Sequence, residues 1–268
     1  MMVTTLLRIL RRTFPWLLAA LVVTPAWPSD FLVHPVSAYS GSIDAILWVT
    51  IAISIVFFAL VVGIMAFVFF RFRAKKAGEE GVRIHGNVPL EIVWTVVPAI
   101  ILVALSIWAV DVFNVELNPP ESTLIVKVTA YQFGFDFSYY ESSPNFQGAQ
   151  TVTVHNICGN PAAFVKIRSL GVKTHGHFEI PQGVPVRFLV TSKDVIHSFW
   201  VPAFMIKRDT VPGLSSDMWL TPTTVGTYPV KCAVLCGPGH DGMRATLKVV
   251  PKAEFSSWLA AHKTLASR

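Results

Sequence analysis

Hydrophobic positions are distributed unevenly along the chain, which has an apolar first part and a second part of short alternating segments. Residues 43–70 carry no charge after Asp44, and residues 92–110 form a second uncharged run that contains Pro98. About 20 helical residues are enough to cross a hydrocarbon core of about 30 Å. The two runs therefore predict a transmembrane hairpin of two helices.

Basic residues follow the first predicted helix, where the sequence has Arg71, Arg73, Lys75, Lys76 and Arg83. Such a cluster is typical of a loop that stays on the cytoplasmic side of the membrane. We therefore expect the first helix to run inward and the second to run outward. On this topology the N-terminus and everything from Asp111 onward lie outside the cytoplasm.

Residues 1–29 have the pattern of a signal peptide, with three early arginines, an apolar run at 16–23 and small residues before Pro28. The apolar run is too short to span a bilayer. We expect cleavage around residues 26–29, and an uncleaved anchor is the alternative.

After Pro119 and Pro120 the pattern changes to short β-branched segments separated by turn residues. These segments are residues 123–129, 133–139, 151–157, 164–167, 184–190, 227–230 and 246–250. They predict an all-β sandwich or Greek-key barrel. The expected order is a signal peptide at 1–29, a hairpin at 30–111, a β domain at 112–251, and a C-terminal helix and tail at 252–268.

Composition supports a membrane protein, because 53% of residues are hydrophobic, 14% are charged and the mean hydropathy is +0.54. The formal charge of +6 could suit nucleic acid, but no basic run is interleaved with aromatic residues. We therefore expect the membrane, and no nucleic acid, as a partner.

The strongest chemical signal is a loop in which Cys232 and Cys236 are followed by His240 and Met243. Thiolates, an imidazole and a thioether favour copper over hard cations. Two cysteines on one loop can bridge two metal ions, and each ion then needs its own imidazole. The second imidazole would come from His197. A disulfide between the cysteines, with a buried structural histidine at 197, is the alternative.

Three motifs resemble subunit II of cytochrome c oxidases. They are His-Ser-Phe-Trp-Val-Pro from His197, Lys-x-Asp-x-Val-Pro-Gly from Lys207, and Cys-x-x-x-Cys-Gly-x-x-His-x-x-Met from Cys232. The resemblance implies a cupredoxin-like domain that holds a binuclear copper centre, CuA. It assigns the bridging thiolates to Cys232 and Cys236, the imidazoles to His197 and His240, the weak axial ligand to Met243, and a carbonyl ligand to Val234.

The resemblance also implies a function, that of the electron-entry subunit of a terminal respiratory oxidase in a bacterial inner membrane. Electrons would pass from a periplasmic donor to the haem groups of subunit I, which reduces oxygen to water, and subunit III would be a further partner. A quinol oxidase subunit, an enzyme resembling nitrous oxide reductase, and a membrane-anchored copper carrier are the alternatives.

Two residues depart from the family pattern. The family usually has a glutamate at the position of Val234, and its carboxylate reaches a magnesium ion, so we expect that magnesium site to be weakened or lost. The family's electron-entry tryptophan is replaced by Phe133, within Gln132-Phe-Gly-Phe135. Phe133 could serve electron entry or be a plain core residue.

The charge of the predicted outer domain bears on the donor, because residues 112–268 hold fourteen Lys or Arg against ten Asp or Glu, a difference of +4. Complementarity favours an acidic, neutral or mainly hydrophobic donor, such as a small copper protein or an unusual c-type cytochrome. The small number of carboxylates would also suit an acidic medium outside the cell, because carboxylates that titrate near pH 4 lose their charge there. An acidic exterior is therefore a hypothesis.

Four further residues have side chains that can carry chemistry. Glu91 lies at the start of the second helix, where the family has a glutamate at the entrance of a proton channel; an interfacial helix-start carboxylate is the alternative. His175 and His177 could share one strand and a metal, but no third ligand converges, which favours surface histidines. Cys158 matches no family ligand and is assigned no role.

Overall fold

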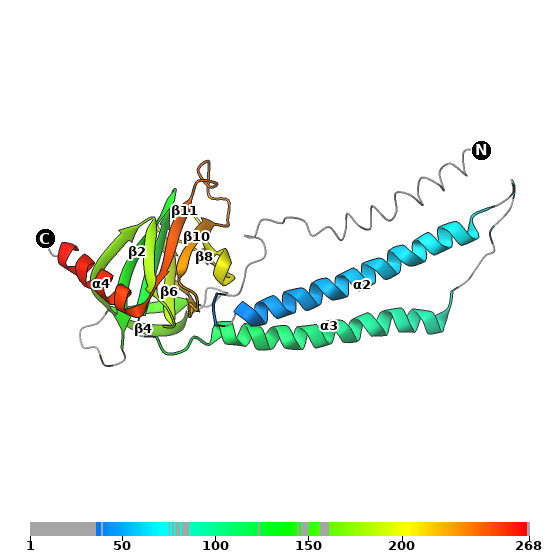
Figure 1. Cartoon of the computed structure of the whole chain (residues 1–268), viewed down its shortest axis with the longest axis horizontal. Helices are drawn as coiled ribbons and strands as arrows, with labels where there is room; N and C mark the ends of the chain where they lie inside the picture. Colours follow the sequence, from blue (N-terminus) through cyan, green and yellow to red (C-terminus); the bar gives the residue numbers. More distant parts are fainter. Residues whose placement is uncertain are drawn as a thin grey trace. The chain divides into compact units, whose positions relative to one another are not determined.

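The computed structural model describes residues 36–38, 40–74, 76, 78, 81, 86–122, 124–143, 145, 150–155 and 161–266 (Figure 1). The expected signal peptide lies outside these residues, as do Lys75, Arg83 and Cys158.

Two long helices, α2 (Ser40–Phe72) and α3 (Val88–Leu117), contain the two apolar runs and extend beyond both. The start of α3 is set by Asn87, whose Oδ1 accepts a hydrogen bond from the backbone N–H of Leu90 at 3.2 Å. Most of their large apolar side chains are exposed, and both helices are long and apolar enough to cross a membrane. These features fit a lipid-facing hairpin.

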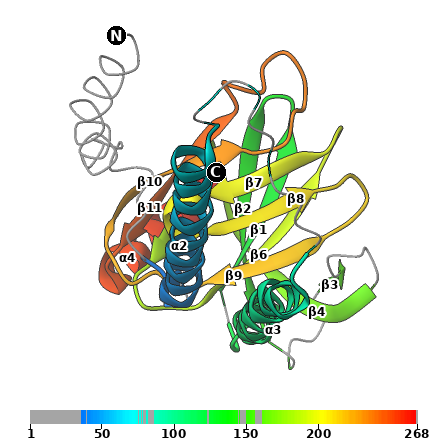
Figure 2. The ribbon, with the colours of Figure 1, turned by 90° about the vertical axis from the view of Figure 1, so that its right-hand side faces the viewer.

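The rest of the chain forms two β-sheets, which Figure 2 shows from the side. The first has the strand order β1 (Leu124–Tyr131), β2 (Gly134–Ser142), β4 (Pro161–His175), β3 (Gln150–His155), β9 (Ser216–Leu220) and β6 (Val186–Ser192), and β6 pairs with β1 to close a ring. The second has the order β5 (His177–Pro181), β11 (Arg244–Val250), β10 (Gly226–Cys232), β7 (His197–Val201) and β8 (Ile206–Thr210). A 3₁₀ turn, η1 (Pro202–Phe204), and a C-terminal helix, α4 (Lys252–Ala266), complete the described elements.

The predicted architecture of two helices followed by a β-sandwich is confirmed, but four short strands were not among the predicted segments. β5, β7, β8 and β9 have five residues each. In β7 four of the five residues are buried, so the alternation that marks a half-exposed strand is missing. The histidines at 175 and 177 do not share one strand, because β4 ends at His175, β5 begins at His177, and Gly176 between them has a φ of +67°.

The main core lies between the two sheets and is rich in aromatic rings. Phe137 and Phe178 stack with ring centroids 4.2 Å apart, and Phe199 contacts both rings from β7. Burying a side chain of this size contributes about 1.5–3 kcal/mol. A smaller cluster fills the other face of the first sheet, formed by Ile125, Val154, Val165, Ile167 and Leu189. The main core includes Phe199 and Val201 of β7 and Val230 of β10, so it holds these two strands in place beneath the candidate metal ligands.

Candidate metal centre

The cysteine loop joins two neighbouring strands of the second sheet. Cys232 is the last residue of β10 and pairs with Phe199 of β7, which brings it close to His197 at the start of β7. The backbone N–H of Cys232 donates to the carbonyl of Met243 at 3.2 Å and closes the loop at its base. Residues far apart in sequence thus meet at one end of the sheet.

A ring nitrogen of His197 and the Sγ atoms of Cys232 and Cys236 all lie within 4.8 Å of one another, and all three residues are buried. The two Sγ atoms are 3.9 Å apart, and both cysteines are free. A disulfide needs about 2.05 Å. Two sulfurs that each lie about 2.3 Å from one metal ion can be this far apart. The separation therefore suits a shared metal and not a disulfide.

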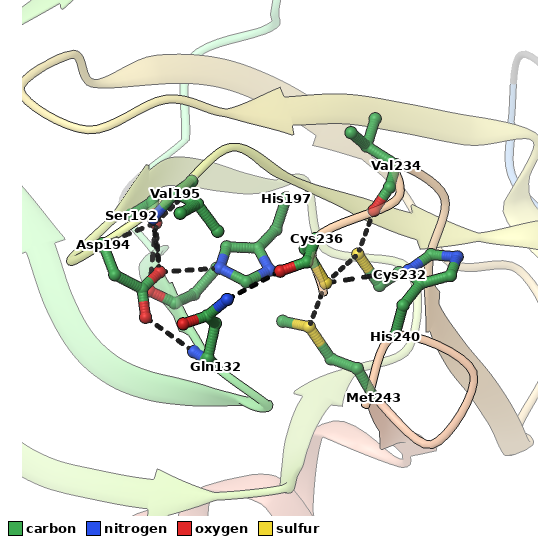
Figure 3. Close-up of polar contacts among 11 residues, drawn as sticks. Gln132, Ser192, Asp194, Val195, His197, Cys232, Val234, Cys236, His240 and Met243 are labelled. Atoms are coloured by element: carbon green, nitrogen blue, oxygen red, sulfur yellow. Dashed lines mark hydrogen bonds and ion pairs between the residues drawn. The ribbon is translucent and has the colours of Figure 1, made fainter. Parts of the chain in front are cut away.

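The other three predicted ligands surround this sulfur pair. From Cys236 Sγ the distance to His240 Nδ1 is 3.7 Å and to Met243 Sδ 3.8 Å, and the carbonyl oxygen of Val234 lies 3.3 Å from Cys232 Sγ. Figure 3 shows His197 on one side of the sulfurs and His240 on the other. All six predicted donors are brought together.

His197 is oriented by a carboxylate. Its Nε2 lies 2.8 Å from Oδ1 of Asp194, while Nδ1 is buried without a hydrogen-bond partner. A proton on Nε2, donated to Asp194, leaves Nδ1 with a free lone pair. A buried polar atom without a partner is costly, and metal binding would satisfy it.

Asp194 is itself held by the backbone. Partial burial favours its neutral form, but hydrogen bonds from His197 and from the N–H groups of Gln132 and Val195 lower the pKa of Asp194 to about 2. Gln132 also donates from Nε2 to the carbonyl of Cys236 at 2.7 Å. One glutamine thus connects the histidine side of the site with the cysteine loop.

The second thiol of the loop resists ionisation in the absence of a cation. Burial, together with the neighbouring Cys232, raises the pKa of Cys236 to about 11. Metal ligation requires the thiolate, so a bound cation would supply the stabilisation that the apolar surroundings do not.

Phe133 covers the cysteine loop and is also 40% exposed. A Cβ atom built on Gly239 would lie 2.6 Å from its Cδ2, and one on Gly237 would lie 3.2 Å from its Cε1. The ring therefore lies directly against the loop at the protein surface. This placement is compatible with electron entry and differs from that of a buried core phenylalanine.

Glu91 lies apart from the centre, in the first turn of α3. Its Oε1 accepts a hydrogen bond from the backbone N–H of Asn87 at 3.3 Å. This contact gives the carboxylate a capping role, and a role in proton entry stays a prediction.

Asp194 and Gln132 were not among the predicted site residues, although Asp194 lies shortly before the histidine motif and Gln132 lies in the segment that contains Phe133. An aspartate three residues before a predicted histidine ligand is a usable signal, because ligating histidines usually donate their second N–H to a carboxylate or carbonyl. The glycines beneath Phe133 gave no such signal, since their contact depends on tertiary structure.

The donor set fits copper. Two thiolates, two imidazoles and a thioether are soft or borderline ligands. The buried Nδ1 of His197 has no hydrogen-bond partner that would compete with a metal ion for its lone pair. Hard cations prefer oxygen ligands, of which this cluster offers only the Val234 carbonyl.

Comparison with known proteins gives matches over both parts of the chain. The family models "Cytochrome C oxidase subunit II, transmembrane domain" and "Cytochrome C oxidase subunit II, periplasmic domain" match residues 33–112 and 124–250. Cytochrome c oxidase subunit 2 of Thermostichus vulcanus is 32% identical over 251 residues, which cover 84% of this chain and 76% of the relative. A probable cytochrome c oxidase subunit 2 of Rickettsia bellii is 30% identical over 224 residues, with coverage of 84% and 79%.

Among solved structures, the periplasmic domain of subunit II of cytochrome oxidase from Bradyrhizobium japonicum is 26% identical, with a TM-score of 0.40. The match covers 55% of this chain and 98% of the chain in the Bradyrhizobium japonicum structure. The two family models match, in chain order, the helical and β parts that the sequence predicts, and the expected cupredoxin-like fold class is confirmed.

Proposed function

The chain belongs to the cytochrome c oxidase subunit II family, and we propose that it is the electron-entry subunit of a terminal respiratory oxidase. In this proposal the six donors of the chain would hold a binuclear copper centre, which would supply electron transfer between a periplasmic donor and the haem groups of subunit I. Oxygen would be reduced to water in subunit I, and subunit III would complete the assembly.

The observation that carries the proposal is the convergence of six donors from two separate segments. His197 comes from β7, while Cys232 ends β10 and is followed in the β10–β11 connection by Val234, Cys236, His240 and Met243. A site of one cysteine would suit a mononuclear centre, whereas the close pair of sulfurs suits two ions.

A copper pair, when bound, supplies a one-electron redox couple. The protein supplies rigidity, because the ligands lie on adjoining strand ends held by the aromatic core, and Asp194 fixes the ring of His197. Protein atoms can fill the ligand positions, so the site favours electron transfer over substrate chemistry. We therefore place the oxygen chemistry in the partner subunit.

The topology supports a periplasmic location for this centre. Arg71 lies in the last turn of α2, Arg73 follows the helix directly, and Lys76 lies in the connection to α3. These basic residues favour a cytoplasmic loop between the helices. The β domain then emerges on the periplasmic side of the bacterial inner membrane.

Two other functions use related folds. A quinol oxidase subunit would not need the copper ligands, all of which converge here. A membrane-anchored copper carrier would use the same site without a haem-bearing partner, so co-purification with a haem protein separates it from the oxidase subunit.

The test is the copper content and EPR spectrum of the full-length chain, purified from membranes in detergent. We expect two copper ions per chain and a mixed-valence signal in which one unpaired electron is shared by both. A mononuclear blue-copper signal, or a chain that takes up no copper, would overturn the proposal.

A further inference from the structure

The face of the first sheet that holds the smaller hydrophobic cluster opens into a polar cavity of about 240 Å³. Its lining is ordered by strand register. Ser138 of β2 pairs with Lys127 of β1 on one side and with Lys173 of β4 on the other. Neighbouring strands lie about 4.8 Å apart, so the two lysines flank Ser138 in one row across the sheet. We call this site the lysine cavity.

The lysine cavity carries an excess of positive charge. Lys193 also lines it, and Asp136 is the one carboxylate in the lining. Asp136 is already engaged, by Lys193 Nζ at 2.7 Å and by His175 Nδ1 at 2.7 Å. In the part of the chain that the structure describes, Lys127 and Lys173 form no ion pair. Two ammonium groups are therefore available to an external anion.

The lysine cavity approaches the candidate copper centre at its Lys193 end. Lys193 lies next in sequence to Asp194, the partner of His197, and its Nζ lies 4.8 Å from the ring centroid of Tyr131. Tyr131 ends β1 directly before Gln132 and Phe133, which contact the cysteine loop. Lys193 of the lysine cavity is thus connected through Tyr131 to the turn at Gln132 and Phe133, which covers the cysteine loop.

An apolar surface surrounds the cysteine loop itself. Large exposed apolar side chains come from three segments that meet at the centre: Phe133 (40% exposed), Val195 (39%), Ile196 (47%) and Leu235 (81%). Protein–protein interfaces commonly combine an apolar centre with a charged rim. Here the apolar centre lies over the ligands and the lysine cavity forms a cationic flank.

We propose that this combined surface docks an electron-donor protein with an acidic face, whose carboxylates enter the lysine cavity while its apolar contact covers Phe133 and Leu235. The inference rests on the proposed electron-entry function and adds to it the charge of the donor and the place where it binds. A lysine-rich donor would meet like charge at Lys127 and Lys173. An acidic donor would be attracted before contact, which raises the association rate.

The experiment uses the purified, copper-loaded oxidase complex with two probes, an acidic c-type cytochrome and a lysine-rich c-type cytochrome. The test variant is the double substitution Lys127→Glu with Lys173→Glu. The matched control, Lys252→Glu with Lys263→Glu, changes the charge equally on helix α4, outside the cavity lining. Affinity is measured by titration and electron transfer by stopped-flow, at low salt and near 1 M salt. Reduction by a small uncharged mediator is followed in parallel.

For the test variant we expect an association rate with the acidic cytochrome lowered by about tenfold at low salt, and a faster reaction with the lysine-rich one. Both differences should vanish near 1 M salt, where the Debye length is about 3 Å. The control should retain the original rates. The milder pair Lys127→Gln with Lys173→Gln, which removes charge without reversing it, should give an intermediate loss.

An unchanged rate in the test variant, or an equal loss in the control, overturns the docking inference while leaving copper reduction by the mediator intact. A loss that persists at high salt, in the Gln pair as well, would also overturn it, since structural damage would then explain the effect. If the mediator fails to reduce the wild-type centre, the proposed function itself fails, and the docking inference fails with it.

Discussion

The carboxylate of Asp194 lies 2.8 Å from Nε2 of His197 and leaves the buried Nδ1 of the same ring facing the two cysteines. The two residues are three positions apart, at the entry to β7. Asp194 also accepts the backbone N–H of Gln132 at 2.7 Å. The orientation of one predicted copper ligand thus depends on a residue that binds no metal itself.

Replacing Asp194 should weaken copper binding without removing a ligand. We expect Asp194→Ala to lower copper affinity about 10- to 100-fold, the usual effect of losing the partner of a ligating histidine. Asp194→Asn should have a smaller effect, because its amide oxygen can still accept the Nε2 proton. Copper titration against a competing chelator measures both. Asp241→Ala is the control, because Asp241 is an exposed carboxylate on the cysteine loop. An equal loss in this control would contradict a specific role for Asp194.

The close packing of Phe133 on Gly239 predicts a steric effect. Gly239→Ala places a Cβ 2.6 Å from the ring, so either the ring or the loop must move. We expect a loss of about 1–3 kcal/mol in stability, typical of overpacking. Thermal unfolding of the copper-loaded protein measures it.

The same loop provides a matched control. Gly242→Ala meets its nearest atom at 3.6 Å, an ordinary contact, and should be nearly neutral. Combining Gly239→Ala with Phe133→Ala should recover part of the loss, because the clashing ring is gone. Additive effects of the two substitutions would show that the two positions do not interact.

The sequence predicted the parts of this protein that follow from local pattern and from the identity of unusual residues. The uncharged runs indicated α2 and α3, and the soft ligands of the cysteine loop indicated copper. It did not predict β7, because a short strand buried on both faces lacks alternation. It also could not predict the row of Lys127, Ser138 and Lys173, which exists only through the register of three strands.

The valine at position 234, where the family usually has a glutamate, predicts that the oxidase complex lacks the family's magnesium site. Its carbonyl lies 3.3 Å from Cys232 Sγ and is unaffected by the side chain, whereas an isopropyl group offers magnesium no oxygen. We expect metal analysis of the purified oxidase to find copper without stoichiometric Mg²⁺ or Mn²⁺. Val234→Glu should introduce that binding and leave the copper EPR signal unchanged. Stoichiometric Mg²⁺ in the unaltered complex would contradict the prediction.

Glu91 can be tested because its two candidate roles require different chemistry. Its Oε1 accepts the N–H of Asn87 at 3.3 Å, and Asn87 in turn accepts the N–H of Leu90. A helix cap needs only an acceptor oxygen, which Gln also provides, whereas proton entry needs a group that ionises. If Glu91 admits protons, Glu91→Gln should lower turnover and proton pumping while the stability of the complex is unchanged.

The complementary variant is Asn87→Ala, which removes the cap and keeps the carboxylate. It should cost about 1 kcal/mol in stability, as lost N-caps do, and leave turnover unchanged. Oxygen consumption and proton release by the reconstituted complex, measured beside thermal unfolding, separate the two effects. Full activity in Glu91→Gln would leave the carboxylate with its capping role alone, because an amide at this position satisfies the same backbone N–H without carrying a proton.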